Sequence, residues 1–573
     1  MEQKIKNLIK YSLKNLDIEV NNIGLEHPSD SKMGDYSTNV AMVVAKNVKT
    51  NPKELADKIK QELDKKLPKE VEKIEVAGAG FINFYLSRDF FAKSIEEILN
   101  NAENVGKNDM LADKKIMIEY TDPNPFKPFH IGHLMSNAIG ESISRLVEFS
   151  GAKMTRANYQ GDLGLHVAKA IHGLLKNKKL QDKNGSNNLQ SSNIGNAYAE
   201  GAEAYEIDAE GHGSKKEIDA INKKIYDKSD KKINDIYDWG FKVTMEAFED
   251  LYKILGTKFD FYFLESQVAP IGENIVQANT GKVFEESDGA IVFKAEKHDQ
   301  KLHTRVFITR EGLPTYETKE LGLTEEKFKT DPEMNLSIVV TANEQMDYMK
   351  VVAKAISLIH PEYASKMRHI THGMMRLSSG KMSSRKGNVI TGEALLNDVR
   401  DAILEKMTDK EFGNEEREKI ASDVAVSAIK YSILKQSTGG DIVYDLESSI
   451  STEGDSGPYL QYSFARANSV IERAQKEYIL PDPHAFPSEI FELEKLLYKF
   501  PEVVLRSASE YEPHYIANYL IEVARAYNSF YGNTVIVNKE DKNSGYKVAL
   551  TYAFSFVMKT GLHLLGIKAP EKM

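Results

Sequence analysis

Short apolar runs alternate with amphipathic segments through the middle of the chain. Between residues 114 and 376, runs typical of buried strands are followed by segments whose apolar residues repeat every three to four positions, as in a helix. The strand candidates are 116–120, 153–159, 336–342 and 369–376, and the helix candidate after the first carries Leu134, Ile139, Ile143 and Leu146 on one face. Because alternating strands and helices build helix-covered parallel sheets, the pattern predicts an α/β domain with a doubly wound parallel sheet.

The two ends of the chain show different patterns. Residues 1–107 mix helical spacing with strand-like runs at 74–76 and 81–86, which predicts a small α+β domain. After residue 396 the three-to-four spacing continues almost to the end and predicts an all-α region, with helices at 396–406, 415–435, 459–478, 488–509, 511–531 and 546–566. We therefore expect domains at 1–107, 108–395, 396–445 and 446–573, with an insertion at about 175–300 where polar residues interrupt the alternation.

Composition narrows the class of protein. A chain of 573 residues suggests several domains, and 41% hydrophobic with 28% charged residues is typical of globular proteins, which excludes a disordered or fibrous chain. Cysteine is absent, which excludes disulfides, thiolate metal sites and cysteine nucleophiles. No N-terminal signal segment or run of 18 apolar residues is present, so we expect a cytoplasmic protein without membrane contact. The net charge of −10 lacks the basic excess of many nucleic-acid-binding domains, but it does not exclude local basic faces.

The first chemical motif follows the first strand of the alternating block. The segment 123–129 is rich in proline, which disfavours a helix before about residue 129 and places His130 and His133 at or near a helix start. Backbone N–H groups and the positive end of the helix dipole suit phosphate there, and Gly132 lets a ligand approach the backbone. For an isolated His-x-x-His the alternative is a pair of packed or solvated histidines.

The second motif, residues 380–388, follows the last strand candidate. Its sequence, Gly-Lys-Met-Ser-Ser-Arg-Lys-Gly-Asn, alternates small residues with cations. Such a loop can close over a polyphosphate and neutralise a leaving pyrophosphate. A solvated basic loop is the alternative for this stretch alone. The first motif opens the first helix of the block, and the second follows its last strand. Together they indicate a nucleotide phosphate site much more specifically than either motif does alone.

Together the His-Ile-Gly-His and Lys-Met-Ser-Ser elements resemble the signatures of class I aminoacyl-tRNA synthetases. The arginyl-tRNA synthetase family is similar in segments that span almost the whole chain: 34–41, 77–83, 119–124, 158–164, 457–462 and 564–573. The resemblance implies a Rossmann-like catalytic domain at 108–395, a tRNA-contacting domain at 1–107, a stem-contacting region at 396–445 and an anticodon-binding domain at 446–573.

The reaction is implied by the same resemblance. The enzyme would activate L-arginine with ATP and Mg²⁺ to arginyl-adenylate and pyrophosphate, and then transfer arginine to the 3′ end of its tRNA. Activation would itself require tRNA. We expect a monomer, and we expect no protein side chain to hold a metal ion.

Individual residues are assigned by the resemblance as well. A guanidinium is a planar fork of donors that keeps its charge, so an acidic pocket suits it on physical grounds too. The residues for arginine are Glu119, Asn124, His133, Tyr316, Glu320 and Gln345, of which Tyr316 and Glu320 would share a helix face. Those for ATP are His130, Gly132, His133, Lys381, Met382, Ser383, Ser384 and Arg385, and those for tRNA are Phe81, Asn83, Tyr459, Arg466, Tyr531 and Met573. The catalytic residues are Lys127, His130, His133 and Lys381.

The chain departs from the family pattern at three positions. Ser384 replaces the second lysine of the usual KMSKS loop, and we hypothesise that Lys127, with Lys381, supplies the missing charge. Leu163 stands where an aromatic residue is usual, and Glu320 where aspartate is frequent. The alternatives are a synthetase for glutamine or lysine, a related nucleotidyltransferase, or a synthetase-like RNA-binding protein without catalysis.

Overall fold

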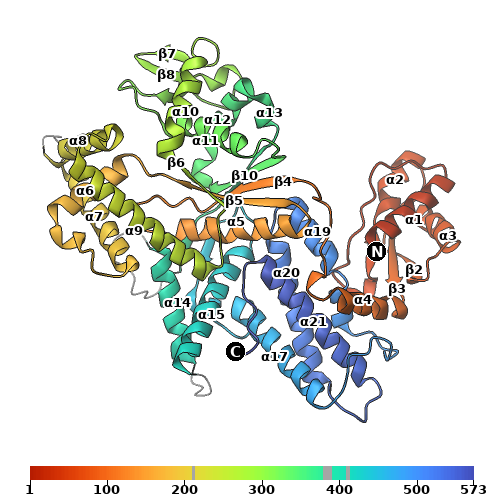
Figure 1. Ribbon diagram of the computed structural model, residues 1–573. Coiled ribbons are helices and arrows are strands. Elements are labelled where there is room, and N and C mark those ends of the chain that lie inside the picture. The colour runs from red at the N-terminus through yellow and green to blue at the C-terminus, as the bar shows by residue number, and fades with distance from the viewer. Residues whose placement is uncertain (209–212, 379–389, 408–412) are drawn as a thin grey trace. The chain divides into compact units, whose positions relative to one another are not determined.

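The computed structural model describes residues 1–208, 213–378, 390–407 and 413–573 (Figure 1). The chain divides into two compact units. The first unit comprises Met1–Val105, Arg466–Pro501 and Glu522–Met558, and the second comprises Gly106–Ala465, Glu502–Ile521 and Lys559–Met573. Within the described ranges, no helix combines the length and the apolar character that a bilayer span needs. The domain boundaries at 107, 395 and 445 stay a prediction.

The N-terminal part of the first unit is built on an antiparallel sheet of order β1-β3-β2. Ile5, Ile9 and Leu13, at the predicted helical spacing, are fully buried on α1 and pack into the core of this sheet and its helices. The strands expected at 74–76 and 81–86 are confirmed. The elements are α1 (Glu2–Asn15), β1 (Tyr36–Thr38), α2 (Val40–Val48), α3 (Pro52–Asp64), β2 (Val71–Ala77), β3 (Phe81–Leu86) and α4 (Arg88–Asn101).

The C-terminal region is helical, as expected, with one correction. The single helix predicted at 488–509 is wrong, because the chain forms α18 up to Leu497 and a separate helix from Phe500. Pro501 gives the physical reason, since proline has no amide hydrogen and is tolerated in the first turn of a helix but not in its interior. The helices are α17 (Gly457–Lys476), α18 (Glu492–Leu497), α19 (Phe500–Glu510), α20 (His514–Asn533) and α21 (Ser544–Leu564).

The second unit contains the predicted parallel sheet, with the strand order β11-β10-β4-β5-β6. The first strand, β4, has its successor β5 on one side and β10 on the other, so the order of strands reverses between β4 and β10. In sheets of this kind, ligands bind at that switch point, outside the carboxyl ends of the strands. Helix α5 packs against β4, β5 and β10, as Figure 1 shows. The elements are β4 (Lys115–Glu119), α5 (Ile131–Phe149), β5 (Lys153–Gln160), β6 (Phe261–Leu264), β10 (Leu336–Ala342) and β11 (Met367–His372).

Two features of this sheet differ from the sequence-based expectation. The strand predicted at 369–376 is two strands, because β11 ends at His372 and β12 (Met375–Leu377) pairs instead with β13 (Ile442–Tyr444). At Gly373, between them, a Cβ atom would lie 2.2 Å from the carbonyl oxygen of Gly440, so only glycine fits at this crossing. The sequence pattern also failed to identify β6, which has four residues and lies inside the segment interpreted as an insertion.

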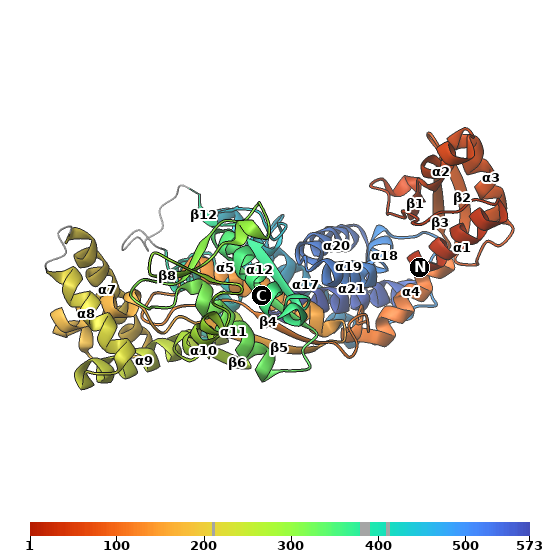
Figure 2. The ribbon, with the colours of Figure 1, turned by 90° about the horizontal axis from the view of Figure 1, so that it is seen from above.

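The segment after β5 forms a helical group with its own core. Helices α6 to α9 surround Val167, Ile171, Ile194 and Ile218, and Phe126 from the turn before α5 enters the same core. In Figure 2, α7, α8 and α9 lie together at one end of this unit. The remaining elements are α6 (Leu165–Lys176), α7 (Asn187–Ile207), α8 (Ser214–Asp227), α9 (Lys231–Leu255), α10 (Glu265–Ala278), β7 (Glu285–Ser287), β8 (Ala290–Phe293), β9 (Arg305–Ile308), α11 (Tyr316–Thr330), α12 (Met346–Ile359), α13 (Pro361–Ala364), α14 (Gly392–Lys406), α15 (Asn414–Leu434) and α16 (Leu446–Ser449).

Candidate active site

The turn after β4 is held in an unusual backbone conformation. Thr121 and Asp122 both have positive φ angles, 81° and 48°, which cost energy in residues that carry a side chain. Helix α5 holds this turn: the backbone N–H of Thr121 donates to Oγ of Ser136 at 2.9 Å, and Nδ2 of Asn137 donates to Oγ1 of Thr121 at 3.0 Å. The turn therefore fixes the direction in which the chain leaves Glu119, at the carboxyl end of the strand.

Three acidic side chains gather beside this turn with one buried ammonium group. Lys327 on α11 places Nζ 2.5 Å from Oε2 of Glu119, and both side chains are buried. Burial and the neighbouring Glu119 carboxylate raise the pKa of Glu320 to about 8. The same two causes, in the same order, raise the pKa of Asp122 well above its usual range. Glu119 is paired with Lys327, and the raised pKa values mean that Glu320 and Asp122 hold their protons near pH 7; a nearby cation would favour their ionised forms, so the group suits a cationic ligand.

The two predicted histidines begin α5 as a stacked pair. The ring centroids of His130 and His133 lie 3.6 Å apart with an interplanar angle of 19°. Nδ1 of His130 accepts the N–H of Gly132 at 3.1 Å, and Nδ1 of His133 accepts the N–H of His130 at 3.2 Å. Burial and the charge of Lys127 lower the pKa of His130 to about 4, and burial and His130 lower the pKa of His133 further. Both rings are therefore neutral near pH 7, with their hydrogens on Nε2.

Lys127 and Asn124 lie in the turn that leads into these histidines. Burial, together with the nearby ammonium group of Lys169, lowers the pKa of Lys127. Its Nζ lies 5.4 Å from the centre of the Tyr198 ring. A Cβ atom on Gly161 would lie 2.1 Å from Oδ1 of Asn124, so glycine is needed for the loop after β5 to pass this close. Lys127 thus lies near enough to His130 to lower its pKa, and Asn124 lies against the loop after β5.

The other residues expected at the arginine site lie on α11 and just before α12. Tyr316 is the first residue of α11, and its exposed fraction is 66%. Glu320 lies one turn later on the helix, beside Glu119. Gln345 accepts a hydrogen bond from the hydroxyl of Tyr348 at 3.0 Å. Burial and the charges of Glu320 and Glu119 raise the pKa of Tyr348, so Tyr348 lies near the acidic side chains and is also hydrogen-bonded to Gln345.

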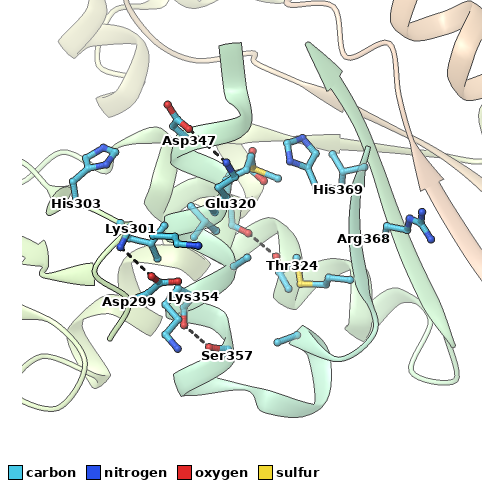
Figure 3. Close-up of a pocket in the computed structure, with 18 of the residues that line it drawn as sticks. Asp299, Lys301, His303, Glu320, Thr324, Asp347, Lys354, Ser357, Arg368 and His369 are labelled. Carbon is cyan, nitrogen blue, oxygen red and sulfur yellow. Dashed lines mark hydrogen bonds and ion pairs between the residues drawn. The ribbon is translucent and has the colours of Figure 1, made fainter. Parts of the chain in front are cut away.

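A cavity of about 580 Å³ borders the acidic group (Figure 3). It lies between α11, α12, β10 and β11, and Glu320 and Lys327 form part of its lining. Val339 and Val352 contribute apolar lining, and Lys301 and Lys354 contribute ammonium groups. Figure 3 shows the labelled side chains around this space, with the Glu320 carbonyl accepting the hydroxyl of Thr324 at 2.9 Å.

Sequence reasoning missed Lys327, Asp122 and Tyr348. A signal existed for Lys327, because it follows Glu320 by seven residues and so returns to the same face of the predicted helix after two turns. For Asp122 the position directly after a buried strand was a hint. Tyr348 gave no sequence signal that separates it from an ordinary helix residue.

The second phosphate motif lies outside the described residues, and so do Lys381, Met382, Ser383, Ser384 and Arg385. The chain directly after it is described and joins the histidine turn. The N–H of Ile131 donates to the carbonyl of Ile390 at 3.2 Å, and the N–H of Gly392 donates to the carbonyl of Phe129 at 2.7 Å. Residues 390–392, which follow the motif in the sequence, thus lie beside His130.

The residues expected to contact tRNA fall into separate groups. In the first unit, the Arg466 guanidinium lies 4.9 Å from the centre of the Tyr531 ring, and its Nη1 donates to Asn528 at 2.5 Å. Phe81 is exposed on β3, but Asn83 is buried and accepts a hydrogen bond from Ser37 at 2.7 Å, which places its amide inside the fold.

In the second unit, Tyr459 lies in the first turn of α17. Met573 lines a cavity of about 400 Å³ together with Tyr462, three residues after Tyr459.

Three family descriptions match the chain. Residues 94–446 match "tRNA synthetases class I (R), catalytic domain", residues 3–86 match "Arginyl tRNA synthetase N terminal domain", and residues 460–573 match "DALR anticodon binding domain". The arginine--tRNA ligase of Clostridium perfringens is 30% identical over 585 residues, covering 99% of this chain and 100% of that protein. The arginine--tRNA ligase of Halothermothrix orenii is 28% identical over 576 residues, covering 100% and 99%.

Two solved structures share the fold. Thermus thermophilus arginyl-tRNA synthetase aligns with a TM-score of 0.81 at 23% identity, covering all of both chains. Arginyl-tRNA synthetase from Plasmodium falciparum aligns with a TM-score of 0.79 at 20% identity, covering 100% of this chain and 99% of that one. At these identities the likeness concerns the fold alone.

Proposed function

The chain belongs to the class I arginyl-tRNA synthetase family and is an arginine--tRNA ligase, and on that premise we propose how its residues bind and activate the substrates. The family, the activity and the fold class expected from the sequence are confirmed. These matches set aside a synthetase for another amino acid and a synthetase-like protein without catalysis. ATP is the nucleotide that the family uses.

The group of buried acidic side chains carries the proposal for arginine. Glu119 and Asn124 bind the ammonium and carboxylate end of the amino acid, with His133 next to them. Tyr316 and Glu320 bind the guanidinium, and Gln345 contributes through the hydrogen bond with Tyr348. Lys327 pairs with Glu119, and the guanidinium of arginine favours the ionised form of Glu320, so arginine binds together with the loss of the Glu320 proton.

For ATP, the histidine pair and the start of α5 support a phosphate site. The neutral rings donate from Nε2, since each Nδ1 accepts a backbone N–H, and the positive end of the helix dipole at Gly132 favours a phosphate. Lys127 and the loop with Lys381, Met382, Ser383, Ser384 and Arg385 supply positive charge, and Mg²⁺ arrives with the triphosphate.

Activation then needs no nucleophilic side chain. A carboxylate oxygen of arginine attacks the α-phosphorus in line, the bond from that phosphorus to the bridging oxygen breaks, and pyrophosphate leaves with the electron pair. The terminal ribose hydroxyl of tRNA attacks the carbonyl carbon of the adenylate, and AMP leaves. The chain's residues orient the reactants and stabilise the charge that develops on the phosphate oxygens.

The tRNA contacts follow the same residues as expected from the sequence. Arg466 stacked on Tyr531 offers a surface for an unpaired base, and Tyr459 and Met573 are further contacts that we propose from the family resemblance. From the N-terminal domain, exposed Phe81 offers a contact to tRNA, and buried Asn83, bonded to Ser37, supports the strand that carries Phe81. We propose that the enzyme acts as a monomer in the cytoplasm.

One experiment tests the arginine site directly. Total tRNA is charged with each amino acid in turn, in the presence of ATP and Mg²⁺, by the native enzyme, by Glu320→Gln and by the control Glu326→Gln. Glu326 lies on the same helix, is half-buried, and pairs with exposed Lys329 across 3.6 Å. We expect arginine alone to be attached. Above pH 8, where the Glu320 carboxyl is mostly ionised, the KM for arginine should be raised at least tenfold in Glu320→Gln and unchanged in Glu326→Gln. An unchanged KM in Glu320→Gln would remove Glu320 from the site.

A further inference from the structure

The segment His563–Lys568, which we call the C-terminal strap, is held by its backbone carbonyls. It comprises the end of α21 and the turn after it. Four of its carbonyl oxygens accept hydrogen bonds from side chains of three other helices: His563 from Arg145 at 3.0 Å, Leu564 from Ser142 at 2.8 Å, Gly566 from Lys430 at 2.9 Å and Lys568 from Gln461 at 2.8 Å. Because backbone carbonyls are the acceptors, the position of the strap depends more on its backbone conformation than on its side chains.

The turn of the strap accepts only glycine. Gly566 has a φ of +67°, and a Cβ atom there would lie 2.8 Å from Nζ of Lys430. Lys430 is fully buried on α15 and also donates to the carbonyl of Leu255, at the end of α9, at 2.6 Å. One ammonium group therefore joins the strap to two helices, and its position is determined from both sides.

From the strap, a short series of hydrogen bonds leads to the arginine site. Nε of Arg145 lies 2.7 Å from Oε1 of Glu141, one turn earlier on α5. The other carboxylate oxygen of Glu141 accepts the hydroxyl of Tyr120 at 2.5 Å. Tyr120 is fully buried and directly follows Glu119 in the chain. Three contacts, through the two side chains of Arg145 and Glu141, thus link the His563 carbonyl of the strap to the neighbour of Glu119.

Helix α5 also packs closely against the ring of Tyr120. A Cβ atom on Gly140 would lie 2.3 Å from the Tyr120 ring, so the helix backbone and the ring are in close contact. Beyond Tyr120 the chain enters the turn with positive φ angles at Thr121 and Asp122. A strained turn keeps its conformation only while its surroundings hold it, so the position of α5 matters for Glu119.

We propose that the C-terminal strap is a positioning element of the arginine site, which acts through Arg145, Glu141 and Tyr120 on the orientation of Glu119. The proposal rests on the proposed role of Glu119 in binding the ammonium group of arginine. Arg145, Glu141 and Tyr120 touch no substrate and serve as positioning residues. With the strap seated, Arg145 holds one oxygen of Glu141, and the other oxygen holds the hydroxyl of Tyr120.

Two variants break this series at opposite ends. Tyr120→Phe removes a single hydroxyl and keeps the ring, and Gly566→Ala disturbs the strap. Each has a matched control: Tyr262→Phe, which removes another tyrosine–glutamate hydrogen bond, to Glu249, and Gly281→Ala, a glycine of φ +83° with no atom within 4 Å of its Cβ position. If Gly566→Ala fails to fold, Ser142→Ala takes its place, since it removes one strap hydrogen bond.

We expect each of the two variants to raise the KM for arginine about fivefold, the effect of one lost hydrogen bond, with kcat and the KM for ATP within about twofold. The double variant should show little further increase, because both changes interrupt one series of contacts. A purely structural role would lower the thermal midpoint and leave the KM for arginine unchanged, and that result, or full additivity, would overturn the proposal.

The variant Glu119→Gln separates this proposal from the one on which it rests. If Glu119→Gln leaves the KM for arginine unchanged, the role of Glu119 is wrong. If Glu119→Gln raises the KM while Tyr120→Phe and the strap variant do not, only the positioning role of the strap is wrong.

Discussion

Nζ of Lys327 lies 2.5 Å from Oε2 of Glu119, and both side chains are buried where the first strand of the sheet ends. A buried ion pair contributes little compared with an apolar pair of the same shape, but the loss of one partner leaves a charge in a place that cannot solvate it. Lys327 therefore provides a buried partner for Glu119 before any substrate arrives.

Replacing Lys327 by methionine should destabilise the catalytic unit strongly. We expect a loss of about 3–5 kcal/mol in the free energy of unfolding, since an uncompensated buried carboxylate remains. Urea unfolding followed by tyrosine fluorescence measures it. The control Lys329→Met removes an exposed lysine two residues away and should change the free energy by less than about 0.5 kcal/mol. Equal effects of the two substitutions would mean that the pair with Glu119 does not matter.

Binding of arginine should improve as the pH rises toward 8. The pKa of Glu320 is raised to about 8, so below that pH its carboxyl group is mostly protonated and cannot pair with a guanidinium. The KM for arginine should therefore fall up to tenfold per pH unit below about 8 and become constant above it. Glu320→Gln should abolish this dependence, and a KM that stays flat between pH 6.5 and 8 in the native enzyme would contradict the assignment.

The raised pKa of Glu320 also affects the stability of the folded protein, which should fall as the pH rises, whereas arginine binding should improve. The folded protein binds more protons at Glu320 than the unfolded chain does between the ordinary carboxyl pKa and about 8. The contribution of the protonated group is therefore complete below the unfolded value and is lost as the pH rises through about 8. Thermal midpoints of the native enzyme and Glu320→Gln across this range should converge at low pH and separate at high pH.

The histidine pair should act on the chemical step without titrating near neutral pH. His130→Ala removes a neutral donor directed at phosphate, and we expect kcat to fall by about 100-fold, with the KM for arginine within twofold. Because the pKa of His130 is about 4, no loss of kcat between pH 8 and 6 should come from this residue. His172→Ala, which removes a histidine paired with Glu217 at 3.1 Å, is the control. A drop in kcat of less than threefold in His130→Ala would refute the role.

Lys127 should replace the lysine that the second motif lacks. If its ammonium group contacts the transferring phosphate only in the transition state, Lys127→Ala lowers kcat at least tenfold, which corresponds to about 1.4 kcal/mol. Lys176→Ala is the matched control, since this lysine is exposed and pairs with Glu217 at 2.9 Å. The hypothesis fails if kcat of Lys127→Ala stays within about threefold of the native value.

Arg466 and Tyr531 should contribute to tRNA binding alone. Tyr531→Ala removes the ring below the guanidinium and should raise the KM for tRNA at least fivefold, since base stacking on an aromatic ring contributes about 1–3 kcal/mol. The KM values for arginine and ATP should stay unchanged. Tyr478→Ala, at a tyrosine whose exposed fraction is 89%, tests whether any surface tyrosine has this effect.

Much of the architecture follows from local pattern, and the departures have identifiable causes. β4, α5 and β10 are long apolar or amphipathic segments, so their period is unambiguous. β6 has only four residues, and the break at Gly373 depends on a close approach of Gly440, which is distant in sequence. For the site, Glu119 and Glu320 could be anticipated from motif and spacing. The pairing of Glu119 with Lys327 depends on how α11 packs over the strand ends, which no local pattern encodes.

The stacked histidines hold their hydrogens through the main chain. Each Nδ1 accepts a backbone N–H, so no neighbouring carboxylate or hydroxyl decides which ring nitrogen is protonated. The backbone conformation at the start of α5 therefore fixes the tautomer of both rings. Surrounding side chains can therefore change during evolution, or be exchanged by design for altered substrate preference. The two Nε2 donors that we propose for phosphate keep their orientation through such changes.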